Sequence, residues 1–167
     1  MTRRLPVETA DRQMPDAAPV VIRLAEERER EALEAIQRRA SLSNPGDRDA
    51  LLAHPDAIDL PAGFISAGQV FVAQQGERTL GFAVVLPRPD DDAELDGLFV
   101  EPDAWRQGVG RLLVEHAADR ARSLGARFLH VTGNSHAAGF YAKLGFVVVG
   151  ETQTRFAPAP LMQRPLS

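Results

Sequence analysis

The 167-residue sequence contains no cysteine, which excludes disulfides, thiolate nucleophiles and thiolate metal sites. It also lacks any apolar run near the roughly 18 residues of a membrane span, and its first residues lack the apolar core of a secretion signal. We therefore expect a cytoplasmic protein with no membrane contact. An excess of basic residues is missing too: the net charge is -4. That balance disfavours a nucleic-acid partner held through phosphate contacts, unless a local basic patch exists.

What is present is typical of one globular domain, with 44% hydrophobic and 25% charged residues. The first 19 residues carry Pro6, Pro15 and Pro19 among charged residues, without hydrophobic periodicity. We expect residues 1–19 to form a flexible arm and residues 20–167 to form a single domain.

Hydrophobic periodicity predicts strands and helices along that domain. The predicted strands are 20–24, 70–74, 80–86, 94–100, 128–132, 146–151 and 161–166, the last two as an antiparallel pair across Pro158–Pro160. The predicted helices are 26–40, 47–54, 108–124 and 135–144. Residues 55–68 are interrupted by proline and glycine and have no assignment.

The most informative segment runs from Val100 to Leu113 and reads as a strand end, a glycine loop and the start of a helix. Gly108 and Gly110 open an amphipathic helix. The first turn of a helix has free N–H groups and the positive end of the helix dipole, both of which suit a phosphate. Glycines let the phosphate approach the backbone. The pattern predicts an anion site there.

A second segment makes the pattern specific, because it repeats a known spacing of residues: Asn134, Ala137, Phe140, Tyr141, Lys143, Gly145 and Phe146. Together the two segments resemble the GNAT superfamily of N-acetyltransferases over roughly residues 20–155. The resemblance implies an α/β fold with a central mixed sheet flanked by helices. One departure is visible: the first loop position, usually Gln or Arg, is Trp105, which puts one side-chain contact in doubt.

The resemblance also implies how acetyl-CoA is held. Its pyrophosphate would bind the loop and helix start formed by Arg106, Gln107, Gly108, Val109, Gly110 and Arg111. Its thioester and pantetheine would meet the backbone of Leu98, Phe99 and Val100, and Asn134 would contact CoA. Tyr141 would protonate the leaving CoA thiolate. The alternatives are an N-cap role for Asn134, a packing role for Tyr141, and ordinary solvated charge for Arg106 and Arg111.

An amine must lose a proton before it attacks, and Glu94 and Asp96 are the candidate acceptors. They lie two residues apart on one strand and so share a face of the sheet. Similar histone-type members of the superfamily carry a glutamate base at the place of Glu94. The alternative is that both are solvated residues at the start of a strand.

The sequence therefore predicts acetyl transfer from acetyl-CoA to a primary amine by direct attack in a ternary complex. The alternative is a non-catalytic acyl-CoA sensor or interaction module. No metal is expected, since the histidines show no ligand spacing, although His136 lies near the predicted site. The acidic residues Asp90, Asp91, Asp92, Glu94 and Asp96 suggest a cationic amine. The resemblance implies that the acceptor, a small molecule or a protein, binds between 26–66 and 152–160. A homodimer stays open.

Overall fold

The computed structural model describes residues 18–134, 136–155 and 157–166, so most of the expected N-terminal arm lies outside the described residues. The described strands form one seven-stranded sheet in the order β1-β2-β3-β4-β5-β7-β6. They are β1 (Val20–Leu24), β2 (Val70–Gln75), β3 (Arg78–Pro87), β4 (Ala93–Val100), β5 (Phe128–Thr132), β6 (Val147–Gln153) and β7 (Pro158–Pro165). Only the β4–β5 pair is parallel among them, so the sheet is mixed, as expected.

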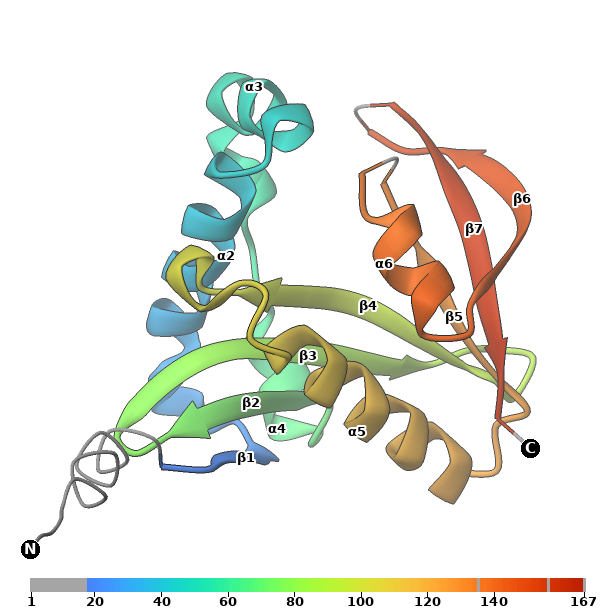
Figure 1. Ribbon diagram of the computed structural model, residues 1–167, viewed down its shortest axis with the longest axis horizontal. Helices are drawn as coiled ribbons and strands as arrows, with labels where there is room; N and C mark the ends of the chain where they lie inside the picture. Colours follow the sequence, from blue (N-terminus) through green and yellow to red (C-terminus); the bar gives the residue numbers. More distant parts are fainter. Residues whose placement is uncertain (1–17, 135, 156, 167) are drawn as a thin grey trace, which may run out of the picture.

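Helices cover both faces of the sheet (Figure 1). They are the 3-10 turn η2 (Glu27–Glu29), α2 (Arg30–Leu42), α3 (Pro45–Ala53), η3 (Pro55–Ala57), α4 (Ala62–Ser66), η4 (Pro102–Ala104), α5 (Val109–Ser123) and α6 (Ala138–Lys143). None of the helices in the described ranges is long and apolar enough to cross a membrane.

Each main helix is amphipathic and buries its apolar stripe against the sheet. In α2 the buried stripe is Leu33, Ile36 and Ala40. Leu33 and Ile36 share a core cluster with Val72 and Phe82 on one face. In α5 it runs from Val109 through Leu113 and Ala117 to Ala121, on the other face. The spacing that predicted these helices is therefore also the spacing that forms the two halves of the core.

The predicted elements agree with the structure, with three differences. The last hairpin turns before Pro158, because β7 already begins there and pairs with Gln153. Helix α6 begins at Ala138, later than expected, since a turn capped by the Asn134 side chain precedes it. The unassigned stretch 55–68 contains η3 and α4, and Ile65 of α4 is buried in the core.

The parallel pair β4–β5 is short, and this fact positions the site. The register joins Ala93 to Leu129 and ends at Leu95 with Val131, although β4 continues to Val100. At the same point the pairing of β4 with β3 shifts, so Asp96 is the extra residue of a β-bulge. Beyond the bulge the carboxyl ends of β4 and β5 diverge (Figure 1).

Candidate active site

A cleft of about 590 Å³ opens where β4 and β5 separate. Its walls come from the end of β4, the loop before α5, the first turn of α5, the end of β5 and helix α6. The cleft brings together most of the residues expected from the sequence: Asp96, Leu98, Phe99, Val100, Arg106, Gly108, Val109, Gly110, Arg111, Asn134 and Tyr141. Two segments far apart in the chain therefore form one concave site.

The loop before α5 is shaped by two residues in the left-handed backbone region, Arg106 at φ 67° and Gly108 at φ 85°. Gly108 is the N-cap of α5, so the loop delivers the free N–H groups of the first helical turn to the cleft. Gly110 lies against Phe140, because a Cβ added there would come within 3.2 Å of the Phe140 ring. Both glycines thus occupy positions where a side chain would strain or crowd the loop.

Trp105, the residue that departs from the family pattern, ties this loop to the sheet. Its indole Nε1 donates a hydrogen bond of 2.8 Å to the Val100 carbonyl at the end of β4. The side chain also lines the cleft, and the residue is 36% exposed. Trp105 therefore fixes the loop, instead of supplying the side-chain contact that a Gln or Arg would make.

Tyr141 reaches the cleft from α6 and is almost fully buried, at 7% exposure. Its ring packs edge-on against Phe140 and Phe146, with centroids 5.2 and 5.4 Å away. Within the described ranges no residue hydrogen-bonds its hydroxyl. Burial raises the pKa of Tyr141 to about 12, so the phenol is a proton donor at neutral pH. The packing role and the donor role are compatible.

Asn134 lies in the cleft wall after β5, where its Oδ1 accepts a hydrogen bond of 2.8 Å from the Ala137 N–H. That bond caps the turn before α6, whereas the N-cap of the helix itself is Ala137, so Asn134 is not the helix N-cap that the alternative interpretation expected. The carbonyl of Asn134 accepts from the same N–H at 3.1 Å. Asn134 is thus a capping residue whose remaining amide group can face the cleft.

Two expected site residues are not brought to the cleft lining. Glu94 lies before the bulge, and its carboxylate is 3.9 Å from the Arg88 guanidinium. Gln107 is exposed and its amide donates to the Asp103 carbonyl at 3.3 Å. Asp96 does line the cleft, and desolvation there raises the pKa of its carboxyl above the usual range. Of the two carboxylates that sequence alternation grouped together, Asp96 therefore lies in the cleft wall and Glu94 does not.

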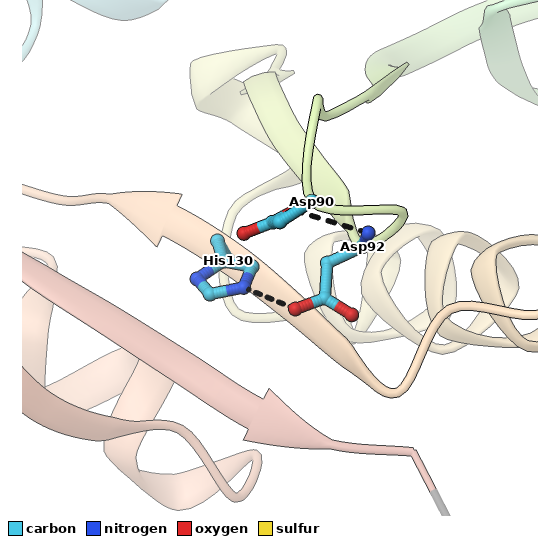
Figure 2. A group of neighbouring side chains, drawn as sticks. All are labelled: Asp90, Asp92 and His130. Carbon is cyan, nitrogen blue, oxygen red and sulfur yellow. Dashed lines mark hydrogen bonds and ion pairs between the residues drawn. The ribbon is translucent and has the colours of Figure 1, made fainter.

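Asp96 lines the cleft, whereas the other acidic residues that suggested a cationic amine do not: Asp90, Asp91, Asp92 and Glu94. The cationic amine itself stays a prediction. Asp92 is buried, and its Oδ1 accepts the N–H groups of Arg127 and Phe128, while its Oδ2 lies 3.0 Å from His130 Nε2. Asp90 Oδ1 accepts the N–H of Asp92 (Figure 2). These bonds join the starts of β4 and β5, at the opposite end from the cleft.

Asp90, Asp92 and His130 also carry side-chain atoms that could bind a metal, and these atoms lie within 4.8 Å of one another. Hydrogen bonds join Asp92 to Asp90 and to His130. The hydrogen bond from His130 keeps the pKa of the Asp92 carboxyl below its usual range, although burial opposes that shift. The cluster of Asp90, Asp92 and His130 therefore connects the start of β4 to β5 through hydrogen bonds, and we call it the clasp.

A second hollow of about 360 Å³ adjoins the cleft and shares Ser41, Asp47, Phe99 and His136 with it. Its other walls are α2, α3, η3 and the β6–β7 hairpin, including Thr154 and Pro158. These are the segments in which the acceptor was expected. Asp47 was missed by the sequence analysis, since nothing in a short Pro-Gly-Asp helix start marks a site residue.

Comparisons with known proteins agree with this geometry. Residues 30–146 match the family described as the acetyltransferase (GNAT) family. A relative from Salmonella typhimurium, named peptidyl-lysine N-acetyltransferase YjaB, is 32% identical over 79% of this chain and 86% of its own length. The crystal structure of a GCN5-related N-acetyltransferase from Rhodopseudomonas palustris superposes with a TM-score of 0.76 at 23% identity, covering 89% of this chain and 97% of the other.

A further solved structure is that of YncA from Salmonella typhimurium, described as a putative acetyltransferase with its cofactor acetyl-CoA. It has a TM-score of 0.66 at 23% identity and covers 90% of this chain and 95% of the other. The mixed sheet with flanking helices is thus the fold of these acetyltransferases, as the sequence resemblance implied.

Proposed function

The chain belongs to the GNAT family of acetyltransferases and is an acetyl-CoA-dependent N-acetyltransferase, and from that premise we propose how its own residues carry out the transfer. Acetyl-CoA binds in the cleft between β4 and β5, and a primary amine reaches it from the adjoining hollow. The observation that carries this proposal is the buried Tyr141 in the wall of a cleft that also receives the first turn of α5. Nothing in the comparisons favours a non-catalytic sensor.

The residues of the cleft fit CoA chemistry. The first turn of α5 offers backbone N–H groups to the pyrophosphate, and Arg106 and Arg111 line the same end of the cleft. The backbone of Leu98, Phe99 and Val100 lies past the bulge, where β5 no longer pairs with β4. This stretch still pairs with β3, and the Val100 carbonyl accepts from Trp105. The backbone groups on the edge that faces away from β3 remain for the pantetheine and for the carbonyl oxygen that gains charge during attack.

Tyr141 is proposed as the proton donor to the CoA sulfur. Support comes from its burial, its place in the cleft and its raised pKa, which keeps the phenol protonated at neutral pH. Of the two proposed proton acceptors, Asp96 lines the cleft and Glu94 does not. Direct attack in a ternary complex is supported by the absence of cysteine, which rules out a thiol acyl-enzyme.

The acceptor is proposed to be a primary amine that is cationic in water. The hollow is lined without any Lys or Arg among its described residues, and its one carboxylate is that of Asp47. A lysine side chain of a peptide is the first probe, because the relative named above is a peptidyl-lysine N-acetyltransferase. A small polyamine is a further probe, since an open hollow admits either.

The test is thiol release from acetyl-CoA in the presence of three probes: an N-terminally blocked lysine peptide, a peptide with a free N-terminal amine, and spermidine. Thiol release and a mass gain of one acetyl group with any of them supports the proposal. Tight acetyl-CoA binding by calorimetry, without thiol release on a broad amine panel, would instead indicate a sensor.

Three further expectations stay predictions. A cytoplasmic location can be checked by fractionation, and metal independence by activity after chelation. A homodimer can be checked by light scattering. The edge strand β6 is the place to look, because Val147, Val148 and Val149 are exposed there.

A further inference from the structure

The contact between His136 and helix α3 stands at the junction of the cleft and the hollow. His136 Nε2 lies 3.6 Å from Asp47 Oδ2, and each side chain is 36% exposed. Both residues line both spaces. An amine that passes from the hollow to the cleft therefore passes this pair.

Gly46 of α3 leaves room for the His136 imidazole. A Cβ added to Gly46 would overlap the His136 ring, with Cε1 and Nδ1 as its nearest atoms. Glycine is a poor helix former, yet Gly46 lies within α3 and its backbone is not in the left-handed region. The close approach of the His136 ring explains why a glycine occupies position 46. It also places the Asp47 carboxylate near the ring.

Position distinguishes this pair from the two carboxylates on β4. Asp96 lines the cleft but not the hollow, and Glu94 lines neither. Imidazole is the side chain that exchanges protons most readily near neutral pH, and a neighbouring carboxylate stabilises the imidazolium that forms. We propose that His136, positioned by Asp47, takes the proton from the incoming ammonium; this inference rests on the proposed acetyl transfer.

The protons balance in this scheme. An alkylammonium carries three protons on nitrogen and the amide product carries one. One proton leaves to solvent through His136, which frees the lone pair that attacks the thioester carbonyl carbon. As the C–S bond breaks, Tyr141 gives a proton to sulfur, and the second nitrogen proton restores Tyr141 through water in the cleft. His136 therefore acts before the new C–N bond forms, and Tyr141 acts as the C–S bond breaks.

Other charged or titratable groups share the cleft with His136 and set the controls. They are Asp96 on β4, Arg106 in the loop, Arg111 on α5 and Tyr141 on α6, with Asp47 on α3. Asp49 lies on α3 as well, but it is exposed and lines neither space. Asp49→Asn is thus a matched control for Asp47→Asn, with the same charge change on the same helix.

The experiment is a pH–rate profile from pH 6.5 to 9.5 with the best of the three amine probes. His136→Gln should lower kcat at pH 7 by about 100-fold and recover most of that loss at pH 9.5, where free amine is abundant. Asp47→Asn should lower kcat at pH 7 by about 10-fold with the same recovery, since it only positions the imidazole. Asp49→Asn should match the wild type.

Three results would overturn the inference. They are a His136→Gln rate within twofold of wild type at pH 7, a loss that is equal at every pH, or a pH-dependent loss that belongs to Asp96→Asn instead. Gly46→Ala adds a variant that moves the ring without removing it, and it should show the His136→Gln profile in weaker form. Thermal unfolding of each variant checks that it is folded.

A readout that needs no turnover separates this inference from the proposed function. The ring-proton chemical shifts of His136 are compared by NMR at one pH in wild type and in Asp47→Asn. They should differ, because the Asp47 carboxylate lies 3.6 Å from His136 Nε2, and identical shifts would remove Asp47 from the scheme. Failure of all amine probes would count against acetyl transfer itself, whereas normal turnover by His136→Gln would count only against His136.

Discussion

The indole of Trp105 donates a 2.8 Å hydrogen bond to the carbonyl of Val100, and so closes the loop between β4 and α5. The proposed pyrophosphate site begins one residue later, at Arg106. The strand end would meet the thioester of acetyl-CoA, and the loop would meet its phosphates. The bond therefore fixes the position of one relative to the other.

Trp105→Phe keeps an aromatic ring and removes the donor. Acetyl-CoA binding should weaken by about fivefold, since one hydrogen bond contributes about 1 kcal/mol net. Isothermal calorimetry measures the Kd. An unchanged Kd would show that the loop keeps its shape without the indole bond.

Gly110→Leu should crowd Phe140 and push side-chain atoms into the cleft at the first turn of α5. Acetyl-CoA affinity should fall about tenfold or more, which corresponds to about 1.4 kcal/mol or more. Gly63→Ala is the control, because no atom lies within 4 Å of a Cβ at Gly63, in helix α4. If both variants bound acetyl-CoA equally well, the pyrophosphate would not bind at the first turn of α5.

Local patterns predicted much of this molecule. The spacing of Leu33, Ile36 and Ala40 was sufficient to predict α2, because burial of one helix face is a short-range property of the sequence. The glycines at 108 and 110 indicated the site for a similar reason, since they mark a loop whose backbone must come close to something.

Contacts across the fold were not predictable in the same way. The bulge at Asp96 depends on how β3 pairs with β4. Glu94 precedes it, where β4 still pairs with β5, and does not line the cleft. The approach of His136 to Asp47 depends on where α3 lies relative to the end of β5. Strand alternation places two carboxylates on one face, but only the three-dimensional pairing decides which of them reaches the site.

The clasp of Asp92 and His130 should stabilise the fold and have no direct part in transfer. Asp92→Ala leaves the N–H groups of Arg127 and Phe128 without their acceptor, so stability should fall by about 1–3 kcal/mol in urea unfolding at pH 7. Asp119→Ala removes an exposed ion pair with Arg122 and should cost less than about 0.5 kcal/mol. If both variants lost a similar amount of unfolding free energy, the clasp would have no special stabilising role.

This contribution should also depend on pH, with a definite sign. The pKa of Asp92 in the folded protein is held below its ordinary value of 3.8. Its ionisation therefore stabilises the fold fully above that value, and the stabilisation is lost as pH falls through the lower folded value. The stability gap between wild type and Asp92→Ala should shrink as pH falls below 3.8. A gap that does not shrink there would contradict the assignment.

Tyr141→Phe tests the proposed donor with the least disturbance to packing. The phenylalanine ring can keep both edge-on contacts, with Phe140 and Phe146, and so the thermal unfolding midpoint should not fall. The hydroxyl is needed only when the CoA sulfur leaves, so its loss should fall on the transition state: kcat should drop by about 100-fold while the Kd for acetyl-CoA stays within about twofold.

The pH profile of the wild type gives an independent check on Tyr141. Because burial raises the pKa of its phenol to about 12, the hydroxyl should still be protonated at pH 10. The wild-type rate should therefore show no descending limb from tyrosine ionisation between pH 7 and 10. A limb near pH 10 that disappears in Tyr141→Phe would mean that the phenol is solvated. A kcat equal to wild type in Tyr141→Phe would make Tyr141 a packing residue, and the sulfur would then take its proton from water in the cleft.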